Sequence, residues 1–153
     1  DQSASLIRGA SISLSVLLAA WTRCKNLGGY LAIFEARNES KWVESYRRSH
    51  SVLSMAFWIA GFHDDLANQW KWRGPQNDFP INSFDWNPGQ PDNADQDCMK
   101  LFEARDNYRW DDSTCAISRE FLCEKRVTIL SWIQQKLYNL QVNLLITGVN
   151  AQC

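Results

Sequence analysis

Two clusters of oxygen-bearing side chains are the part of this sequence whose composition and spacing could do chemistry. The first spans residues 90–97 and the second is the Trp-Asp-Asp run at residues 110–112. Carboxylate and amide oxygens are the ligands that calcium takes, in sets of six to eight at about 2.3–2.6 Å. So many carboxylates on one segment would repel one another without a cation. A bridge between Cys98 and Cys115 would bring the two clusters together into one cation site.

Catalysis by the same residues is disfavoured. The adjacent carboxylates of Asp111 and Asp112 would point to opposite faces of an extended strand, which argues against a catalytic pair. The two histidines, His50 and His63, have no nearby serine or cysteine nucleophile pattern, so we expect both at the surface. A nucleophile, a base and an orienting group at suitable spacing are not recognisable. We therefore expect no enzyme, and a hydrolase in particular is disfavoured.

The five cysteines indicate a disulfide framework. They form neither a CxxC pair nor a zinc-finger pattern, so two disulfides and one remaining cysteine is the simplest interpretation. Four paired cysteines allow three connectivities, and their spacing alone leaves these open. Disulfides indicate an oxidising compartment, so we expect a secreted, extracellular protein. The remaining cysteine is expected to be Cys153, as a candidate for a bond between subunits.

Composition limits the remaining classes of function. The chain has 153 residues, enough for one domain with a single core. Its formal net charge of −1 gives no general attraction to nucleic acid or to anionic membranes, so we expect neither as a partner. No run reaches the roughly 20 apolar residues of a membrane-spanning helix. Because the chain begins at Asp1, we take it as mature protein and the apolar run after Arg8 as the entry to a helix.

Hydrophobic periodicity predicts the elements that must position the two clusters. Apolar residues recur at helical spacing in residues 16–26, and Gly28-Gly29 is typical of a helix end. In a second, more polar helix we expect Trp42, Val43 and Tyr46 to face inward. Residues 63–97 are rich in Asn, Asp, Gly, Pro and Trp and are expected to be irregular and functional. The predicted elements are helices at residues 16–26 and 39–48 and strands at residues 30–34, 56–62, 98–103 and 119–124.

The end of the chain is a candidate oligomerisation element. Its apolar residues follow the seam of one helix, although alternation after Leu140 leaves a strand open for its last part. Lys136 is the only charged side chain after residue 126. We therefore expect a domain at residues 1–125 and an apolar extension at residues 126–153 that packs on the domain or on a second subunit. The seam residues are Leu130, Ile133, Leu137, Leu140 and Leu144.

A series of ordered landmarks gives residues 16–125 a family resemblance. The landmarks are Cys24, Gly28-Gly29-Tyr30-Leu31-Ala32, Trp58-Ile59-Ala60-Gly61, Trp70, Trp72, Trp86, Gly89-Gln90-Pro91-Asp92-Asn93, Cys98, Trp110-Asp111-Asp112 and Phe121-Leu122-Cys123-Glu124. In this order they resemble the C-type lectin family. The resemblance implies an α+β C-type lectin-like domain with two helices, small antiparallel sheets and a long irregular loop region, here followed by a C-terminal helical extension. It also implies the disulfides Cys24–Cys123 and Cys98–Cys115.

The resemblance further implies the residues of a sugar site. Its calcium would be held by Gln90, Asp92, Gln96, Asp111 and Asp112. A cis peptide bond before Pro91 would let the flanking side chains project together, and two adjacent sugar hydroxyls would complete the calcium shell. In this family Gln-Pro-Asp accompanies galactose-type ligands and Glu-Pro-Asn accompanies mannose-type ones. The implied ligand is terminal galactose or N-acetylgalactosamine on glycans, bound by a secreted, multivalent homo-oligomer in recognition or agglutination.

The chain departs from the family pattern at three positions. Gln96 stands where Glu is usual and lowers the charge of the site, whereas Asp111 stands where Asn is commoner and restores it. Ala94 stands where strong galactose binders carry a tryptophan. Tyr108 is therefore a candidate sugar contact, with Phe62 and His63 as alternatives. A possible second metal site, as in many relatives, comprises Asp64, Asn68, Asn93 and Asp97.

Other functions stay open beside this one. A lectin-like domain can bind a protein, a mineral or an ice surface instead of a sugar, although ice-binding members usually have more than five cysteines. The apolar extension is the only indication of a membrane-active toxin subunit. Asn38-Glu39-Ser40 is a glycosylation sequon at the start of a predicted helix, so its use stays open.

Overall fold

The computed structural model describes residues 7–9, 16–35, 39–49, 56–104, 107–126, 130, 133, 134 and 136. The chain divides into two compact units, Leu6–Lys125 and a second unit formed by Asp1–Ser5 and Arg126–Cys153. The larger unit has the α+β architecture that was predicted. Its helices are α1 (Val16–Asn26) and α2 (Glu39–Ser49), and its strands are β1 (Ile7–Gly9), β2 (Tyr30–Leu31), β3 (Ala56–Asp64), β4 (Gln69–Trp72), β5 (Phe79–Pro80), β6 (Cys98–Ala104), β7 (Asn107–Ser113) and β8 (Glu120–Glu124).

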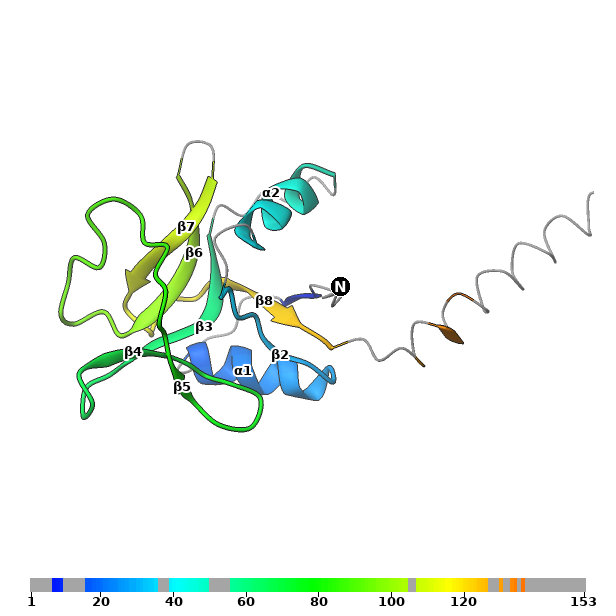
Figure 1. The fold of residues 1–153 in the computed structure, drawn as a ribbon, viewed down its shortest axis with the longest axis horizontal. Coiled ribbons are helices and arrows are strands. Elements are labelled where there is room, and N and C mark those ends of the chain that lie inside the picture. The colour runs from blue at the N-terminus through cyan, green and yellow to red at the C-terminus, as the bar shows by residue number, and fades with distance from the viewer. Residues whose placement is uncertain are drawn as a thin grey trace, which may run out of the picture. The chain divides into compact units, whose positions relative to one another are not determined.

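The strands form one branched sheet around β3. The path runs β1-β8-β3-β4-β5, with β2 paired to β8 and with β6 paired to both β3 and β7. Only the β3–β8 pair is parallel among the described strands. Helix α1 packs against β2, β3 and β8, whereas α2 packs against β7 (Figure 1). The core between them is aromatic, because Trp58, Trp72 and Trp110 are each at most 2% exposed.

Helix α1 begins and ends at the predicted residues. Leu17, Ala20 and Cys24 are buried and recur every three to four residues, so one stripe faces the core. Gly28 adopts a φ of +77°, which glycine tolerates without strain. The amides of Gly28 and Gly29 donate to the carbonyls of Lys25 and Cys24, both at 3.0 Å, and so satisfy the last turn of the helix.

Helix α2 lies where it was predicted but one expected core residue faces outward. Val43 is buried at 2% exposure, whereas Trp42 is 44% exposed. The Trp42 ring instead stacks on Tyr46, with centroids 5.1 Å apart. The inward orientation expected of Trp42 is therefore wrong, because neighbouring positions on a helix point about 100° apart and Val43 takes the core position.

The segment expected to be irregular contains a β-hairpin and a short strand. Strand β3 continues to Asp64, and β4 turns back along it in the register Gly61↔Trp72 to Asp64↔Gln69. Strand β5 then pairs with β4. Two further strands, β1 and β7, lie where none was predicted, and the predicted strand at residues 30–34 is shortened to Tyr30–Leu31. The remaining irregular part, from residue 81 to Cys98, is the segment that carries the first oxygen cluster.

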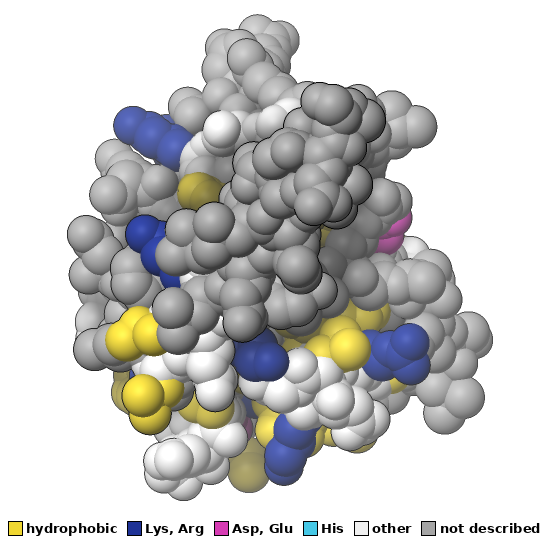
Figure 2. Space-filling model, turned by 90° about the vertical axis from the view of Figure 1, so that its right-hand side faces the viewer, with side chains coloured by type: hydrophobic (Ala, Val, Ile, Leu, Met, Phe, Trp, Pro, Cys, Tyr) yellow, Lys and Arg dark blue, Asp and Glu magenta, His cyan; other side chains and the backbone are white. Residues whose placement is uncertain are grey.

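The second unit is described at only a few positions. Leu130, Ile133, Gln134 and Lys136 are helical, whereas the other predicted seam residues and Cys153 lie outside the described residues. Within the described part of the chain, no helix is both long and apolar enough to cross a membrane. On the face shown in Figure 2, the described Lys and Arg side chains are dispersed among apolar and uncharged ones.

Candidate functional site

Backbone hydrogen bonds bring the two oxygen clusters side by side. The Asn87 amide donates to the Trp110 carbonyl at 2.7 Å, and the Trp110 amide donates to the Asp85 carbonyl at 3.0 Å. Trp86 and Trp110 thus form a parallel bridge, and their rings meet edge to face at 5.9 Å. The loop that follows Trp86 is therefore anchored on β7, next to the second cluster.

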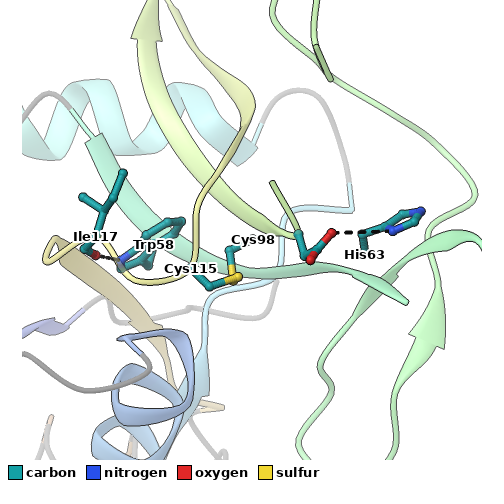
Figure 3. The surroundings of a disulfide bond; sticks show 6 residues. Trp58, His63, Cys98, Cys115 and Ile117 are labelled. Atoms are coloured by element: carbon teal, nitrogen blue, oxygen red, sulfur yellow. Dashed lines mark hydrogen bonds and ion pairs between the residues drawn. A yellow bond between two sulfur atoms is a disulfide. The ribbon is translucent and has the colours of Figure 1, made fainter. Parts of the chain in front are cut away.

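The disulfide Cys98–Cys115 anchors the same two segments at their other ends. It joins the start of β6 to the turn after β7, 17 residues apart in sequence. The second disulfide, Cys24–Cys123, links α1 to β8. Both disulfides implied by the resemblance are present. Figure 3 shows Cys98–Cys115 beside β3, between Trp58, whose Nε1 donates to the Ile117 carbonyl at 3.2 Å, and His63.

Asp112 binds the backbone of the loop that carries the first oxygen cluster. Its side chain is fully buried, and its two carboxylate oxygens accept from the backbone amides of Asp92 at 3.3 Å and Asn93 at 3.2 Å. The peptide bond between Gln90 and Pro91 is cis, as the resemblance implied. A buried carboxylate that accepts two backbone hydrogen bonds fixes the position of the loop relative to β7.

Gln90 carries an oxygen suited to a cation. Its Oε1 is buried and has no hydrogen-bond partner among the residues that the structure describes, and the same holds for Oδ1 of Asn87. A buried acceptor without a partner costs roughly 1–3 kcal/mol. The exposed Asp92 follows two residues later on the same loop, and the buried Asp112 accepts a hydrogen bond from the Asp92 backbone amide. These residues fit a hard cation such as calcium, because it would satisfy the unpaired oxygen and the carboxylates together.

Asp111 has a positively charged neighbour, Lys100, on the adjacent strand. It faces Lys100 across the β6–β7 ladder, and Lys100 Nζ lies 3.1 Å from its Oδ1. Burial lowers the pKa of the nearby Arg119, and the negative charge of Asp111 opposes that shift. Asp111 therefore does not add uncompensated charge, contrary to the expectation that it restores what Gln96 removes. Sequence reasoning missed Lys100, although its place two residues after Cys98 puts it opposite Asp111 once the strands pair.

The remaining predicted sugar-site residues differ in exposure. Gln96 is half-buried, and its backbone amide donates to the backbone carbonyl of Asn93 at 3.1 Å. Tyr108 is only 1% exposed and packs against Phe57 with ring centroids 6.0 Å apart. Its ring belongs to the core, so the expectation that it offers a surface to a sugar is corrected. Phe62 is half-buried and lies under the guanidinium of Arg73.

Three of the four residues of the possible second metal site have side-chain partners outside that set. Asp64 Oδ2 lies 2.5 Å from Lys71 Nζ, and this hydrogen bond is the main cause that lowers the pKa of Asp64. Asn68 adopts a φ of +47° in the turn before β4, and Asn93 Oδ1 accepts from the Asp95 amide at 3.0 Å. Asp97 lies within 3.8 Å of the His63 ring instead.

Comparison with known proteins decides the family. The model of the C-type lectin domain family matches residues 17–125, which is most of the chain. The chain belongs to the C-type lectin family.

Among curated relatives of this lectin, Perlucin of Haliotis laevigata is 32% identical over 106 residues, which cover 67% of this chain and 64% of Perlucin. A Perlucin-like protein of Mytilus galloprovincialis is 28% identical over 61% of this chain and 58% of its own length. The chain thus spans less than two thirds of the length of either relative.

Solved structures show the same fold. The carbohydrate-recognition domain of the mouse scavenger receptor C-type lectin superposes with a TM-score of 0.61 at 26% identity, covering 80% of this chain and 90% of that domain. A calcium-independent type II antifreeze protein superposes with a TM-score of 0.65 at 23% identity, covering 84% of this chain and 90% of the other. C-type lectin domains typically bind calcium and carbohydrate, and the second similarity supports the fold alone.

Proposed function

We propose that this chain is a calcium-dependent lectin for terminal galactose or N-acetylgalactosamine. The calcium would be held by oxygens of Gln90, Asp92, Gln96, Asp111 and Asp112. The observation that carries the proposal is the buried Oε1 of Gln90, which has no hydrogen-bond partner in the described part of the chain. It lies on a loop whose backbone amides are held by the carboxylate of Asp112. When bound, the calcium would coordinate two adjacent sugar hydroxyls, and no covalent chemistry is involved.

The preference for galactose rests on which side of the site carries the amide. A sugar hydroxyl that binds calcium also donates to a carboxylate and accepts from an amide NH₂. Gln90 supplies an amide before the cis proline and Asp92 supplies a carboxylate after it. Exchanging the two groups would reverse the donor and acceptor pattern that the sugar meets. Membership of the family supports carbohydrate binding, and the Gln-Pro-Asp order supports the choice of sugar.

Affinity chromatography on immobilised galactose and mannose in millimolar calcium tests this proposal. We expect retention on galactose, release by a chelator, and transfer of retention to mannose in the double variant Gln90→Glu/Asp92→Asn. Asp78→Asn, a half-exposed carboxylate outside the site, is the matched control and should behave like the parent protein. Retention of the parent on mannose would contradict the sugar preference. No retention on either column would favour the alternative of a protein, mineral or ice ligand.

We also propose that the protein is secreted and that residues 126–153 assemble it into homo-oligomers. The two disulfides support an oxidising compartment. Exposed sugar sites bind weakly one at a time, so several sites on one particle would raise the effective affinity for glycosylated surfaces. Light scattering of the chain with and without residues 126–153, and after Cys153→Ser, would show whether the extension sets the oligomeric state.

Replacing Lys100 with methionine should tighten calcium binding. The ammonium group sits 3.1 Å from Asp111, so it competes with a metal ion for that carboxylate and repels the ion. A positive charge about 4 Å from a bound ion costs about 1 kcal/mol even at the dielectric constant of water, and these side chains are only 16% and 14% exposed. The Kd should therefore fall at least roughly fivefold. Isothermal titration with calcium at low and high salt measures the effect, which should shrink as salt screens the charge.

Lys71→Met is the matched control for this variant, because Lys71 pairs with Asp64 and not with a residue of the proposed site. Its calcium affinity should stay near that of the parent. Unchanged or weaker calcium binding in Lys100→Met would mean that Asp111 does not contribute to the cation site.

A further inference from the structure

A histidine and two aspartates converge at the end of β3, apart from the residues proposed to hold calcium. The Nδ1 of His63 lies 2.9 Å from Oδ1 of Asp65 and 3.8 Å from Oδ1 of Asp97. One ligand atom from each of the three residues lies within 4.8 Å of the other two. The imidazole is 22% exposed, whereas the two carboxylates are 76% and 40% exposed. The group is therefore open to solvent on the side of the carboxylates.

Backbone contacts position two of these residues relative to each other. The His63 amide donates to the Asp97 carbonyl at 2.8 Å, directly after the Phe62↔Cys98 pair of the β3–β6 ladder. Asp97 precedes Cys98, whose disulfide to Cys115 holds the start of β6 (Figure 3). The two side chains thus start from neighbouring, hydrogen-bonded strands, and their approach does not depend on long flexible side chains.

The turn after β3 and the ring of Trp70 complete the arrangement. Asp64 Oδ1 accepts from the amides of Leu66 and Ala67, which fixes the turn that presents Asp65. The His63 ring meets Trp70 edge on, with centroids 5.5 Å apart. The contact with Trp70 restricts the orientation of the imidazole, so that Nδ1 faces the two carboxylates.

We propose that His63, Asp65 and Asp97 bind a divalent transition-metal ion of the zinc type. An imidazole nitrogen with carboxylate oxygens suits zinc, whereas calcium takes oxygen ligands. Ligands bound to zinc at about 2.0–2.2 Å in a tetrahedron lie roughly 3.3–3.6 Å apart. The two distances from Nδ1, 2.9 and 3.8 Å, bracket that separation. Three protein ligands leave the fourth position to water or to a donor group of a ligand.

This site differs in chemistry from both calcium sites that the sequence indicated. It shares Asp97 with the possible second calcium site, but Asp64 is paired with Lys71, and His63 supplies a nitrogen ligand instead. It shares no residue with the Gln90–Asp112 set. The inference therefore does not depend on the proposed sugar binding.

Titration of the intact protein with Co²⁺, first without calcium and then after addition of millimolar calcium, followed by displacement with Zn²⁺, tests the site. Co²⁺ in a tetrahedral N/O site gives a visible absorption band, and we expect one equivalent to bind and to be displaced by Zn²⁺. The band should be lost in His63→Gln and strongly reduced in Asp97→Asn. It should persist in His50→Gln, which removes the other histidine, and in Asp92→Asn, which alters the proposed sugar site.

Three results would overturn the proposal. The first is no saturable binding by the parent protein, and the second is an unchanged band in His63→Gln. The third is full displacement of Co²⁺ by millimolar calcium, which would assign these carboxylates to a calcium site. Circular dichroism of each variant establishes that it is folded, so that a lost band reports on ligands.

Discussion

Removing the disulfide Cys24–Cys123 with the double variant Cys24→Ala/Cys123→Ala should lower the free energy of unfolding by about 5 kcal/mol. The bond closes a loop of 99 residues between α1 and β8, and longer loops lose more chain entropy when they are closed in the unfolded state. Both cysteines are at most 1% exposed, so the variant also loses packed sulfur from the core. Urea denaturation followed by tryptophan fluorescence measures the change.

Cys98→Ala/Cys115→Ala is the informative comparison. Its loop of 17 residues predicts a smaller loss, about 3 kcal/mol. Because this bond anchors both oxygen clusters, it should cost calcium-dependent retention on galactose even where the domain stays folded. The Cys24–Cys123 variant should keep its retention under folding conditions. Equal losses of stability, or retention lost first in the Cys24–Cys123 variant, would contradict this division of roles.

The parts of the fold that depend on local signals could be predicted from the sequence. Helix α1 has an apolar stripe and a Gly28-Gly29 end, and both lie within one stretch of chain. The second helix was placed as well, but Trp42 was assigned to the core. The sequence of a short helix does not distinguish an exposed aromatic side chain from a buried one, because burial depends on which face of α2 packs against β7.

Features that depend on strand pairing could not be predicted in the same way. The β3–β4 hairpin lies in a segment whose Asn, Asp and Gly content indicates loops, and pairing with β3 overrides that local tendency. Lys100 meets Asp111 only through the β6–β7 register, and His63 meets Asp97 only through the β3–β6 pair. Long-range pairing also places Tyr108 in the core.

The predictions about the two oxygen clusters came from two sources, the residue types with their spacing and the family resemblance. Composition and spacing predicted a cation site and its dependence on Cys98, whereas the family resemblance implied which cysteine pairs with which and the cis bond before Pro91. Neither source revealed that Asp112 accepts hydrogen bonds from the loop backbone. That contact makes one of the predicted ligands a structural support at the same time.

Replacing Asp112 with asparagine should abolish calcium-dependent retention on galactose and lower the free energy of unfolding by roughly 1–3 kcal/mol. Each carboxylate oxygen accepts from one backbone amide, Asp92 at 3.3 Å and Asn93 at 3.2 Å. Asparagine keeps the shape but turns one acceptor into an NH₂ donor, so one of the two amides would face another donor in a fully buried place. The loop would shift away from β7 and carry Gln90 with it.

The neighbouring variant Asp111→Asn separates this effect from a simple loss of charge. It removes the same unit of negative charge, but Asp111 faces Lys100 and no loop amide in the described contacts. We expect Asp111→Asn to keep retention on galactose, because the asparagine amide still offers calcium one oxygen. It should lower the free energy of unfolding by about 1–3 kcal/mol, since it takes the charged partner from Lys100 in a mostly buried place. Thermal unfolding in the presence of a chelator compares the stability of the two variants without metal. The galactose column compares their sugar binding with calcium. If Asp112→Asn bound galactose as well as Asp111→Asn does, neither the charge of Asp112 nor its second acceptor oxygen would be needed to hold the loop, which would contradict the role proposed for this carboxylate.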